Sequence, residues 1–330
     1  MRAMAIDRFG GPDVLHLADL PVPEPVAGEV LIRSAFASVN PADWKIREGW
    51  LQGYFEYRFP FIVGFDAAGV VAKLGPGVTG YKVGDRVVTA SNLGKGEWGS
   101  YAEYVKSDID RVVRLPDHVG FADAASIPTA GITAFEGIFD VGHVEPGQSV
   151  LINGGAGGTG SYAIQLAKMA GAKVAATCST GNLEYVRGLG ADLAIDYRKE
   201  DIARALKAWQ PDGVDFVFDT VGQGSLLQSV SLAKDGGIVS PIATLIQNEP
   251  HPDAADAKTR GVTIQVSMSS FERQGRQLRG LVDAMGKGKI RAPQLEILDL
   301  AQAAEALRRV QDGHVRGKIL LKIADPGTWV

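Results

Sequence analysis

A glycine-rich turn near the middle of the chain constrains its fold most. Residues 151–160 read Leu-Ile-Asn-Gly-Gly-Ala-Gly-Gly-Thr-Gly, so a hydrophobic run leads directly into closely spaced glycines. Gly155, Gly157 and Gly160 have the G-x-G-x-x-G spacing. In a dinucleotide-binding turn the first glycine permits the tight turn, the second lets the backbone approach a pyrophosphate, and the third lets helix and strand pack closely. The helix that follows offers free N–H groups and a positive dipole end to phosphates.

The residues around this turn supply the context that the motif alone lacks. Apolar runs predict strands at 149–152, 173–177, 193–195, 214–218 and 237–240. Helical patterns lie between them, at 161–169 and at about 181–189, 200–209 and 224–233. Strand and helix alternating in this way predict an α/β fold with a doubly wound parallel sheet. We therefore expect a Rossmann dinucleotide-binding domain over residues 123–291.

The sequence of the first 122 residues predicts a different kind of domain. It is rich in Gly and Pro, and its β-prone runs lie at 29–37, 67–74, 85–90 and 100–105. These features predict a compact, mostly antiparallel β-domain over residues 1–122. The strand expected at 317–323, preceded by a helix at about 301–311, is expected to return to it, so that residues 292–330 complete this domain. The polar stretch 249–260 is expected to be a surface loop.

Composition limits the partners and the compartment. The formal net charge of the 330 residues is −4 and no run of Lys or Arg forms a basic stripe, which argues against nucleic acid as a partner. No apolar stretch reaches the roughly 18 residues that a membrane span needs. Charges near Met1 stand where a signal peptide has an apolar core. Cys178 is the sole cysteine and cannot form an intramolecular disulfide. We expect a cytoplasmic enzyme without nucleic-acid or membrane partners.

Several further segments resemble one known family over nearly the whole chain. They are Ser-Val-Asn-Pro-Ala-Asp-Trp-Lys at 38–45, Gly-Phe-Asp-Ala-Ala-Gly-Val-Val at 64–71, Gly-Asp-Arg-Val at 84–87, Ala-Gly-Ile-Thr-Ala at 130–134 and Gly-Ala-Asp…Ile-Asp-Tyr at 190–197. With these segments the chain resembles the medium-chain dehydrogenase/reductase superfamily, in its zinc-free quinone oxidoreductase branch and most of all its enone (alkenal/one) reductases. The resemblance implies that the β-domain is a GroES-like substrate domain. It also implies a homodimer, with the edge strand near 262–266 as the expected contact.

The superfamily also contains zinc alcohol dehydrogenases, so a metal site has to be tested. A catalytic zinc ion needs about three protein ligands and an open position. The zinc-binding members have Gly-His-Glu where this chain has Gly64-Phe65-Asp66, and Phe65 cannot coordinate a metal. Their early cysteine ligand falls near Asn40, and the five histidines of this chain are scattered. We expect metal-free chemistry.

The residues after the second strand of the dinucleotide domain bear on the choice of cofactor. An NAD-specific site places Asp or Glu about 20 residues beyond the glycines to bind the ribose 2′-hydroxyl. Here the segment 177–182 reads Thr-Cys-Ser-Thr-Gly-Asn and has no carboxylate. Ser179, Thr180 and Asn182 are therefore candidate ligands of a 2′-phosphate; Ser179 and Thr180 could instead cap the next helix, and the two roles could coexist. We predict NADPH as the cofactor.

The resemblance adds further cofactor residues and one departure. Tyr197 is expected at the 2′-phosphate, while close relatives often have a lysine where this chain has Asn182. Arg198 or Arg187 could supply the missing charge. The turn itself is expected to contact the cofactor through Gly155, Ala156, Gly157, Gly158, Thr159 and Gly160, and the carboxyl edge of the sheet through Gly222 and Pro241. Thr133 is expected at the nicotinamide ring unless it only bonds within its helix, and Lys318 is expected near the cofactor.

Asn40, Asp43 and Lys45 are the candidate catalytic residues. The bound nicotinamide would supply the hydride, and hydride addition to an enone moves negative charge onto the carbonyl oxygen. A lysine ammonium or an amide N–H would stabilise that charge, and enone reductases have lysine where Lys45 stands. Lys45 could also be a solvated lysine, and Asn40 and Asp43 could cap the turn at Pro41. Aromatic residues that could wall the acceptor pocket, or lie in the core, are Trp44, Tyr54, Phe55, Tyr57, Phe59 and Trp98.

Three functions follow from these residues. The first is a zinc-independent, NADPH-dependent oxidoreductase that transfers hydride to the activated C=C bond of enones and alkenals. The second uses the same cofactor to reduce quinones. The third is a protein that binds NADPH without catalysis.

Overall fold

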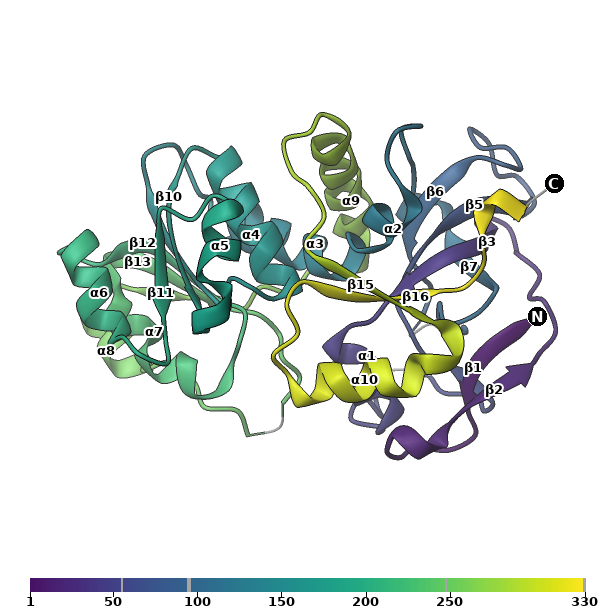
Figure 1. The fold of residues 1–330 in the computed structure, drawn as a ribbon, viewed down its shortest axis with the longest axis horizontal. Helices are drawn as coiled ribbons and strands as arrows, with labels where there is room; N and C mark the ends of the chain where they lie inside the picture. Colours follow the sequence, from purple (N-terminus) through teal and green to yellow (C-terminus); the bar gives the residue numbers. More distant parts are fainter. Residues whose placement is uncertain (55, 94–95, 247, 329–330) are drawn as a thin grey trace. The chain divides into compact units, whose positions relative to one another are not determined.

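The computed structural model describes residues 1–54, 56–93, 96–246 and 248–328, which fold into two compact units (Figure 1). Unit 1 comprises Met1–Ala130 and Phe271–Val330, and unit 2 comprises Gly131–Ser270. Phe55, one of the aromatic candidates, lies outside the described residues.

Unit 2 contains the predicted doubly wound sheet. Its strands are all parallel and follow the order β11-β10-β9-β12-β13-β14. Their bounds are β9 Ser149–Asn153, β10 Lys173–Cys178, β11 Leu193–Asp196, β12 Val214–Asp219, β13 Ala233–Pro241 and β14 Thr263–Ile264. The helices are α4 Gly158–Met169, α5 Leu183–Gly188, α6 Ile202–Trp209, α7 Leu226–Leu232 and α8 Ala254–Arg260. The order reverses between β9 and β12, which is the point where such sheets bind ligands. The predicted α/β Rossmann fold is confirmed.

Hydrophobic side chains explain why these strands form the interior. The burial pattern of β9 is continuous, as expected for a parallel strand covered on both faces. Leu151, Val217 and Val239 on adjacent strands share one buried cluster with residues from α6, α7 and α8. This packing fixes the carboxyl ends of the strands at one edge.

Unit 1 is mostly antiparallel, as predicted. Its larger sheet has the order β15-β16-β3-β5-β6-β8, with β7 paired to β3. The bounds are β3 Glu29–Ser38, β5 Asp66–Leu74, β6 Arg86–Ala90, β7 Tyr104–Asp108, β8 Val112–Arg114, β15 Leu295–Asp299 and β16 Lys318–Lys322. A smaller sheet joins β1 Arg2–Ile6, β2 Leu15–Asp19 and β4 Phe61–Ile62. Further helices are α1 Pro41–Arg47, α2 Phe121–Ala125, α3 Pro128–Phe135, α9 Phe271–Gly286 and α10 Ala303–Asp312. β16 pairs antiparallel with β3, so the C-terminal segment completes this sheet.

The units divide at other residues than the expected 122/123 and 291/292. α2 and α9 belong to unit 1. α2 packs on β3 and β5, while α9 packs on β8 and on the short helix Ile109–Arg111 before it. Gly275 allows the close approach of α9, because a Cβ there would lie 1.9 Å from the carbonyl oxygen of Asp110. Nothing in the hydrophobic pattern of α9 indicates which unit it packs against.

Two local expectations were wrong. The stretch 249–260 contains α8, because the Asp253 side chain caps Ala255 and Asp256 and Gly261 ends the helix in the left-handed conformation. The strand expected at 100–105 begins at Tyr104 instead. Residues before it bond elsewhere: the Tyr101 N–H donates to Val63 O at 3.2 Å and the Tyr101 carbonyl accepts from Met4 N–H at 2.8 Å.

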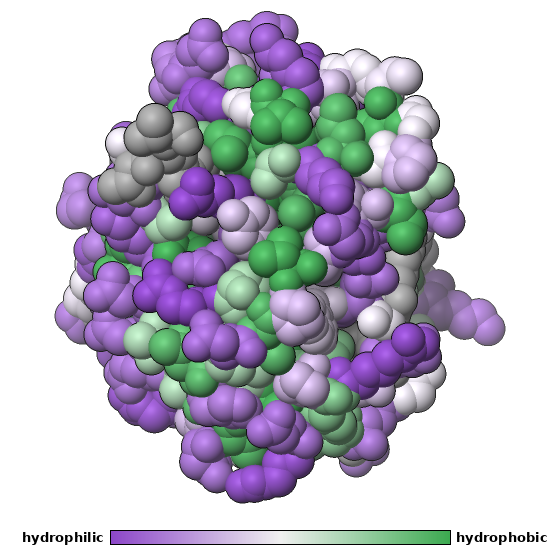
Figure 2. All heavy atoms as spheres, turned by 90° about the vertical axis from the view of Figure 1, so that its right-hand side faces the viewer, coloured by the Kyte–Doolittle hydropathy of each residue, from purple (hydrophilic) through white to green (hydrophobic). Residues whose placement is uncertain are grey.

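No helix among the described residues is long and apolar enough to cross a bilayer. On the face of unit 1 that Figure 2 presents, hydrophobic residues are interspersed with hydrophilic ones.

Candidate cofactor and active site

The glycine turn of unit 2 joins β9 to α4 as predicted. Gly154 has a φ of 78°, which places it in the left-handed region. Its N–H donates to Thr177 Oγ1 at 3.1 Å, and the Gly155 N–H donates to Thr177 O at 2.9 Å. These bonds tie the turn to the end of β10. Gly157 is the N-cap of α4, with Ala156 before it and Gly158 and Thr159 beginning the helix.

A Cβ atom would meet different surroundings at each of the three glycines of the motif. A Cβ at Gly155 would lie 2.8 Å from the Ala176 Cβ, and a Cβ at Gly160 would lie 2.2 Å from the Gly154 carbonyl oxygen. Both positions therefore need glycine for packing within the protein. A Cβ at Gly157 would meet only Gly154 O, at 3.5 Å, so it would project into open space at the helix N-terminus. This open space suits a phosphate group and fits a dinucleotide.

Other predicted cofactor residues lie at the carboxyl edge of the same sheet. Asp219 ends β12 and accepts hydrogen bonds from Asn153 Nδ2 at 2.9 Å and from Gly222 N–H at 2.8 Å. Pro241 ends β13 directly beside Asp219 in the strand register. Thr133 lies half-buried in the last turns of α3. The structure thus brings Gly222 and Pro241 to the edge that carries the glycine turn.

The candidate 2′-phosphate residues also lie at this edge. Ser179 precedes the short helix Thr180–Asn182, which leads into α5. Asn182 Nδ2 donates to Ser179 Oγ at 3.0 Å, and Thr180 Oγ1 donates to Asp196 Oδ2 at 2.5 Å. Asp196 was not among the candidates. Tyr197 follows it and is 45% exposed.

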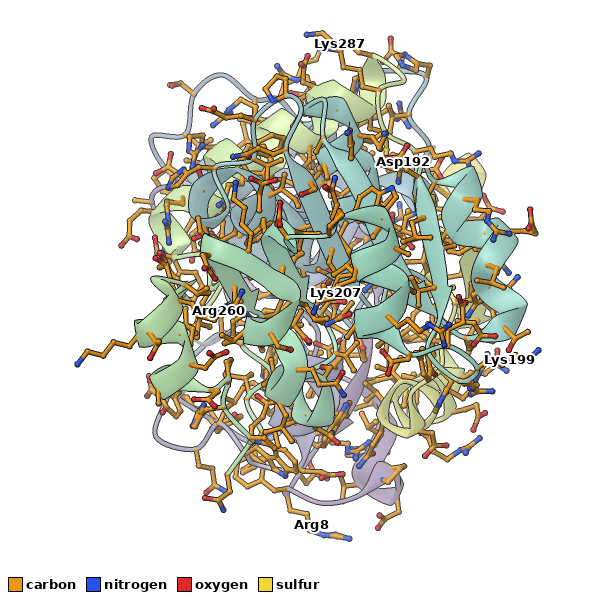
Figure 3. All side chains as sticks on the ribbon, turned by 90° about the vertical axis from the view of Figure 1, so that its left-hand side faces the viewer. Arg8, Asp192, Lys199, Lys207, Arg260 and Lys287 are labelled. Carbon is orange, nitrogen blue, oxygen red and sulfur yellow. The ribbon has the colours of Figure 1, made fainter. Side chains whose placement is uncertain are left out.

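A separate cavity of about 290 Å³ in unit 2 lies away from these residues. It is bordered by Lys207 and Arg260, both labelled in Figure 3, and by residues 210–213 before β12. Because those residues precede β12, the cavity lies at the amino end of that strand, away from the glycine turn. Arg260 donates to Asp235 and to two backbone carbonyls, so its guanidinium is already engaged.

In unit 1, Asn40 and Lys318 lie in one buried network. The Lys318 ammonium donates to Asn40 Oδ1 at 2.5 Å and to Val39 O at 2.9 Å. Asn40 Nδ2 donates to Asp66 Oδ2 at 2.9 Å and to Ser38 O at 3.4 Å. The other oxygen of Asp66 accepts from the Thr129 hydroxyl at 2.6 Å. The network therefore joins β16, the start of α1, β5 and α3. Lys318 was expected at the cofactor, and the structure shows its contacts with Asn40.

Asp43 extends this network toward Tyr101. Its Oδ2 accepts from Asn40 N–H and from Tyr101 OH, each at 2.8 Å, while its Oδ1 is buried with no hydrogen-bond partner. Burial raises the pKa of Asp43 to about 7, against the lowering effects of these hydrogen bonds and of Lys318. Burial likewise raises the pKa of Asp66 and lowers that of Lys318. The predicted capping of the turn at Pro41 by Asn40 and Asp43 is present as a capping box.

Lys45 lies on α1, one turn after this anchored start. It is buried, and its ammonium lies 5.2 Å from the ring centroid of Trp44. Among the aromatic candidates, Tyr57 and Phe59 pack edge-on against Phe9, the Trp98 indole N–H donates to Pro60 O, and Tyr54 is exposed. The catalytic roles of Lys45, Asn40 and Asp43 stay predictions.

The residues at the position of the zinc site in related enzymes do not fit a zinc ion. No group of three His, Cys, Asp or Glu side chains is gathered in the described part of the chain. Phe65 offers no ligand atom, and the Lys318 ammonium occupies the Asn40 oxygen. A zinc ligand has to offer a free lone pair, and at this position the Lys318 ammonium is itself a cation that already uses the Asn40 oxygen.

Sequence reasoning missed Asp66, Tyr101 and Thr129 as members of this network. The motif at 64–71 contains Asp66, and that was the available signal. No such signal exists for Tyr101 or Thr129, because their bonds to Asp43 and Asp66 join residues 58 or more positions apart.

Comparisons with known proteins identify the family of this chain. Residues 26–117 match the family described as alcohol dehydrogenase GroES-like domain, and residues 189–321 match the one described as zinc-binding dehydrogenase. The chloroplastic quinone-oxidoreductase QR1 of Triphysaria versicolor is 33% identical over 98% of this chain and 98% of its own length. The NADPH-dependent alkenal/one oxidoreductase of Arabidopsis thaliana is 35% identical, covering 97% of this chain and 79% of that protein.

The chain belongs to the quinone oxidoreductase branch of the medium-chain dehydrogenase/reductase superfamily. It is an oxidoreductase, as the sequence predicted. A mycobacterial protein solved in complex with NADPH has the same fold, with a TM-score of 0.85 and 29% identity over 98% of this chain and 100% of that one.

Two glycine substitutions should separate cofactor contact from packing in this oxidoreductase. Gly157→Ala should leave the melting temperature nearly unchanged, since φ is −76° and the new methyl group meets open space. It should weaken NADPH binding, because the methyl group enters the phosphate site. Gly160→Ala should instead lower the melting temperature, because its Cβ would overlap Gly154 O. Thermal unfolding and fluorescence titration measure both. If Gly157→Ala bound NADPH as well as the wild type, the turn would not be the phosphate site.

Asp43→Asn should flatten the pH dependence of stability. The folded-state pKa of about 7 lies above the ordinary 3.8, so the protonated carboxyl contributes stability that is full below about pH 4 and is lost as the pH rises through 7. The asparagine carbonyl can keep both hydrogen bonds and does not ionise. The melting temperature should therefore fall less from pH 5 to pH 8 in Asp43→Asn than in the wild type. Asp13→Asn, at an exposed carboxylate, is the control. Parallel curves for wild type and Asp43→Asn would contradict the burial of a protonated Asp43.

Proposed function

We propose that this chain is a zinc-independent, NADPH-dependent oxidoreductase that transfers hydride to the activated C=C bond of enones and alkenals. The observation that carries the proposal is the buried network of Lys318, Asn40 and Asp66, which anchors the start of α1, the helix that carries Lys45. The relative named alkenal/one oxidoreductase supports the same substrate class.

Unit 2 supplies the residues that would hold NADPH. The open space at Gly157 and the N-terminus of α4 would take the pyrophosphate, and Ser179 and Tyr197 lie beyond the ends of β10 and β11 for the adenosine end. The segment 177–182, which ends β10 and leads into α5, has no carboxylate. When bound, NADPH supplies the hydride, and the chain's own task is to orient the acceptor and stabilise the charge that develops on it.

Lys45 is the proposed donor to the acceptor. Hydride addition to the β-carbon of an enone moves negative charge onto the carbonyl oxygen, and an ammonium group held beside that oxygen lowers the barrier. The two amide hydrogens of Asn40 are engaged by Asp66 and Ser38. Asn40 and Asp43 therefore act as positioning residues, which fix the helix that carries Lys45.

The direct test follows NADPH oxidation with a panel of enones, alkenals and quinones. We expect turnover of enones with a higher kcat/KM for NADPH than for NADH. The quinone alternative is favoured by the relative named quinone-oxidoreductase, and faster turnover of quinones than of enones would establish it. Binding of NADPH with no turnover of any acceptor would favour a non-catalytic NADPH-binding protein. Equal kcat/KM for the two nicotinamides would contradict the cofactor assignment.

Lys45→Met should reduce enone turnover without affecting the cofactor. Methionine keeps the volume of the buried side chain and removes only its charge, so we expect kcat/KM to fall roughly 100-fold while the Kd for NADPH stays unchanged. Lys73→Met, an exposed lysine on β5, is the matched control and should keep full activity. Unchanged turnover in Lys45→Met would remove Lys45 from the mechanism.

We also propose a homodimer that forms through the outer edge of β14. Among the described residues this strand is the last of the unit 2 sheet, so one row of its backbone groups has no neighbouring strand. Val266 and Met268 follow it with 53% and 66% exposure, and two copies of such an edge can pair. A monomeric mass in solution would contradict this assembly.

With its single, buried cysteine, the protein suits a reducing compartment, and we propose the cytoplasm, testable by cell fractionation.

A further inference from the structure

Two segments of unit 2 form one surface where β10 and β11 end. Cys178 and Asp196, the last residues of these strands, are neighbours in the sheet register. Tyr197 N–H donates to Cys178 O at 3.2 Å, which carries the hydrogen-bonded pairing one residue further. Residues 179–182 and 196–199 therefore lie side by side. We call these two segments the β10–β11 end.

Only some of the neutral donors at the β10–β11 end can serve a ligand. The Thr180 hydroxyl donates its single hydrogen to Asp196. The Ser179 hydroxyl accepts from Asn182 Nδ2, so its own hydrogen remains available to an acceptor. The phenol of Tyr197 belongs to a half-exposed side chain. Neutral donors for a phosphate are therefore few.

The β10–β11 end also carries a negative charge that opposes an anion. Hydrogen bonds from Thr180 and from the Arg198 N–H, together with the charges of Lys199 and Arg198, lower the pKa of Asp196 despite its desolvation. Asp196 is thus ionised at neutral pH. A doubly charged phosphate bound nearby needs a cation, and Asn182 does not provide one.

Of the cations close to this end, Arg187 and Arg198 differ in their partners. Arg187 forms a salt bridge with Glu184 within α5. Arg198 is exposed, and in the described part of the chain it forms no salt bridge with another side chain. Its guanidinium lies 5.8 Å from the ring centroid of Tyr197, while its backbone N–H donates to Asp196 Oδ1 at 3.0 Å. The neighbouring Lys199 side chain lies at the periphery of the face in Figure 3.

We propose that Arg198, held against the Tyr197 ring, binds the 2′-phosphate of NADPH, with the Ser179 hydroxyl as a second donor. The proposal rests on the proposed function, because it takes NADPH as the cofactor. A guanidinium offers two parallel N–H groups that match a phosphate, and the cation–π contact with the Tyr197 ring favours conformations on that side of the segment. Arg198 thereby makes the chain selective for NADPH although Asp196 is ionised and Asn182 is neutral.

The test compares Arg198→Gln with Arg187→Gln, which removes the same charge from a guanidinium already paired within α5. Dissociation constants for NADPH and NADH are measured by fluorescence titration at two salt concentrations. Arg198→Gln should weaken NADPH binding roughly 10- to 100-fold and leave NADH binding unchanged. It should also reduce the salt dependence of NADPH binding. Arg187→Gln should leave both constants unchanged. Arg198→Lys should be intermediate, since it keeps the charge and loses the paired donors.

The outcomes separate this proposal from the proposed function. A wild-type preference for NADPH that survives in Arg198→Gln overturns the role of Arg198 and leaves the cofactor assignment intact. An equal loss for both nicotinamides also overturns it, because Arg198 would then contact a part common to both. A wild-type protein without any preference overturns the cofactor assignment and this proposal together. Because Arg198 is exposed, an unchanged circular dichroism spectrum and melting temperature verify the fold of each variant.

Discussion

The buried ammonium of Lys318 connects parts of unit 1 that are far apart in the sequence. It bonds Asn40, 278 residues away, and through Asn40 it reaches Asp66. The four elements that meet here are β16, α1, β5 and α3. A charge removed from water is tolerated only when it is paired and hydrogen-bonded. Lys318 meets this requirement with two oxygen acceptors and the nearby carboxylates of Asp66 and Asp43. The start of α1 is thereby fixed, and with it the position of Lys45.

The same network accounts for the opposite pKa changes in the site. Burial favours the neutral form of each group, so it raises the pKa of both aspartates and lowers that of Lys318. Lys318 opposes the rise in both aspartates and they oppose its fall, whereas the charge of Asp66 adds to the rise in the pKa of Asp43. Burial is the largest cause of the Asp43 pKa of about 7, and the charge of Asp66 adds to it, while the hydrogen bonds from Asn40 and Tyr101 and the charge of Lys318 act against it. The positive charge of this network is the Lys318 ammonium, whose hydrogen bonds the oxygens of Asn40 and Val39 accept.

The sequence predicted the features that depend on neighbouring residues. The strands around the glycine turn were located closely, because hydrophobic runs and turn residues are local signals, and Gly155, Gly157 and Gly160 lie where their spacing indicates. The polar stretch that contains α8 was taken for a loop because its stability comes from the Asp253 cap and not from an apolar face. The place of α9 depends on its contact with Asp110, which no local pattern records. The partners of Asn40 and of Thr180 were likewise hidden, since each bond joins different strands or helices.

The two candidate sites differ in how they are built, and this decides which could be recognised. The candidate phosphate site of unit 2 is formed by backbone groups, which require glycine for steric reasons and leave a recognisable spacing. The site of unit 1 is formed by side chains from distant segments, and many combinations of residues could hold a helix and a charge in place. The β10–β11 end combines backbone groups and side chains. The strands fix the backbone there, while the exposed side chain of Arg198 can change without disturbing the core. Selectivity for the cofactor can therefore change by substitutions at that end while the fold and the hydride chemistry stay the same.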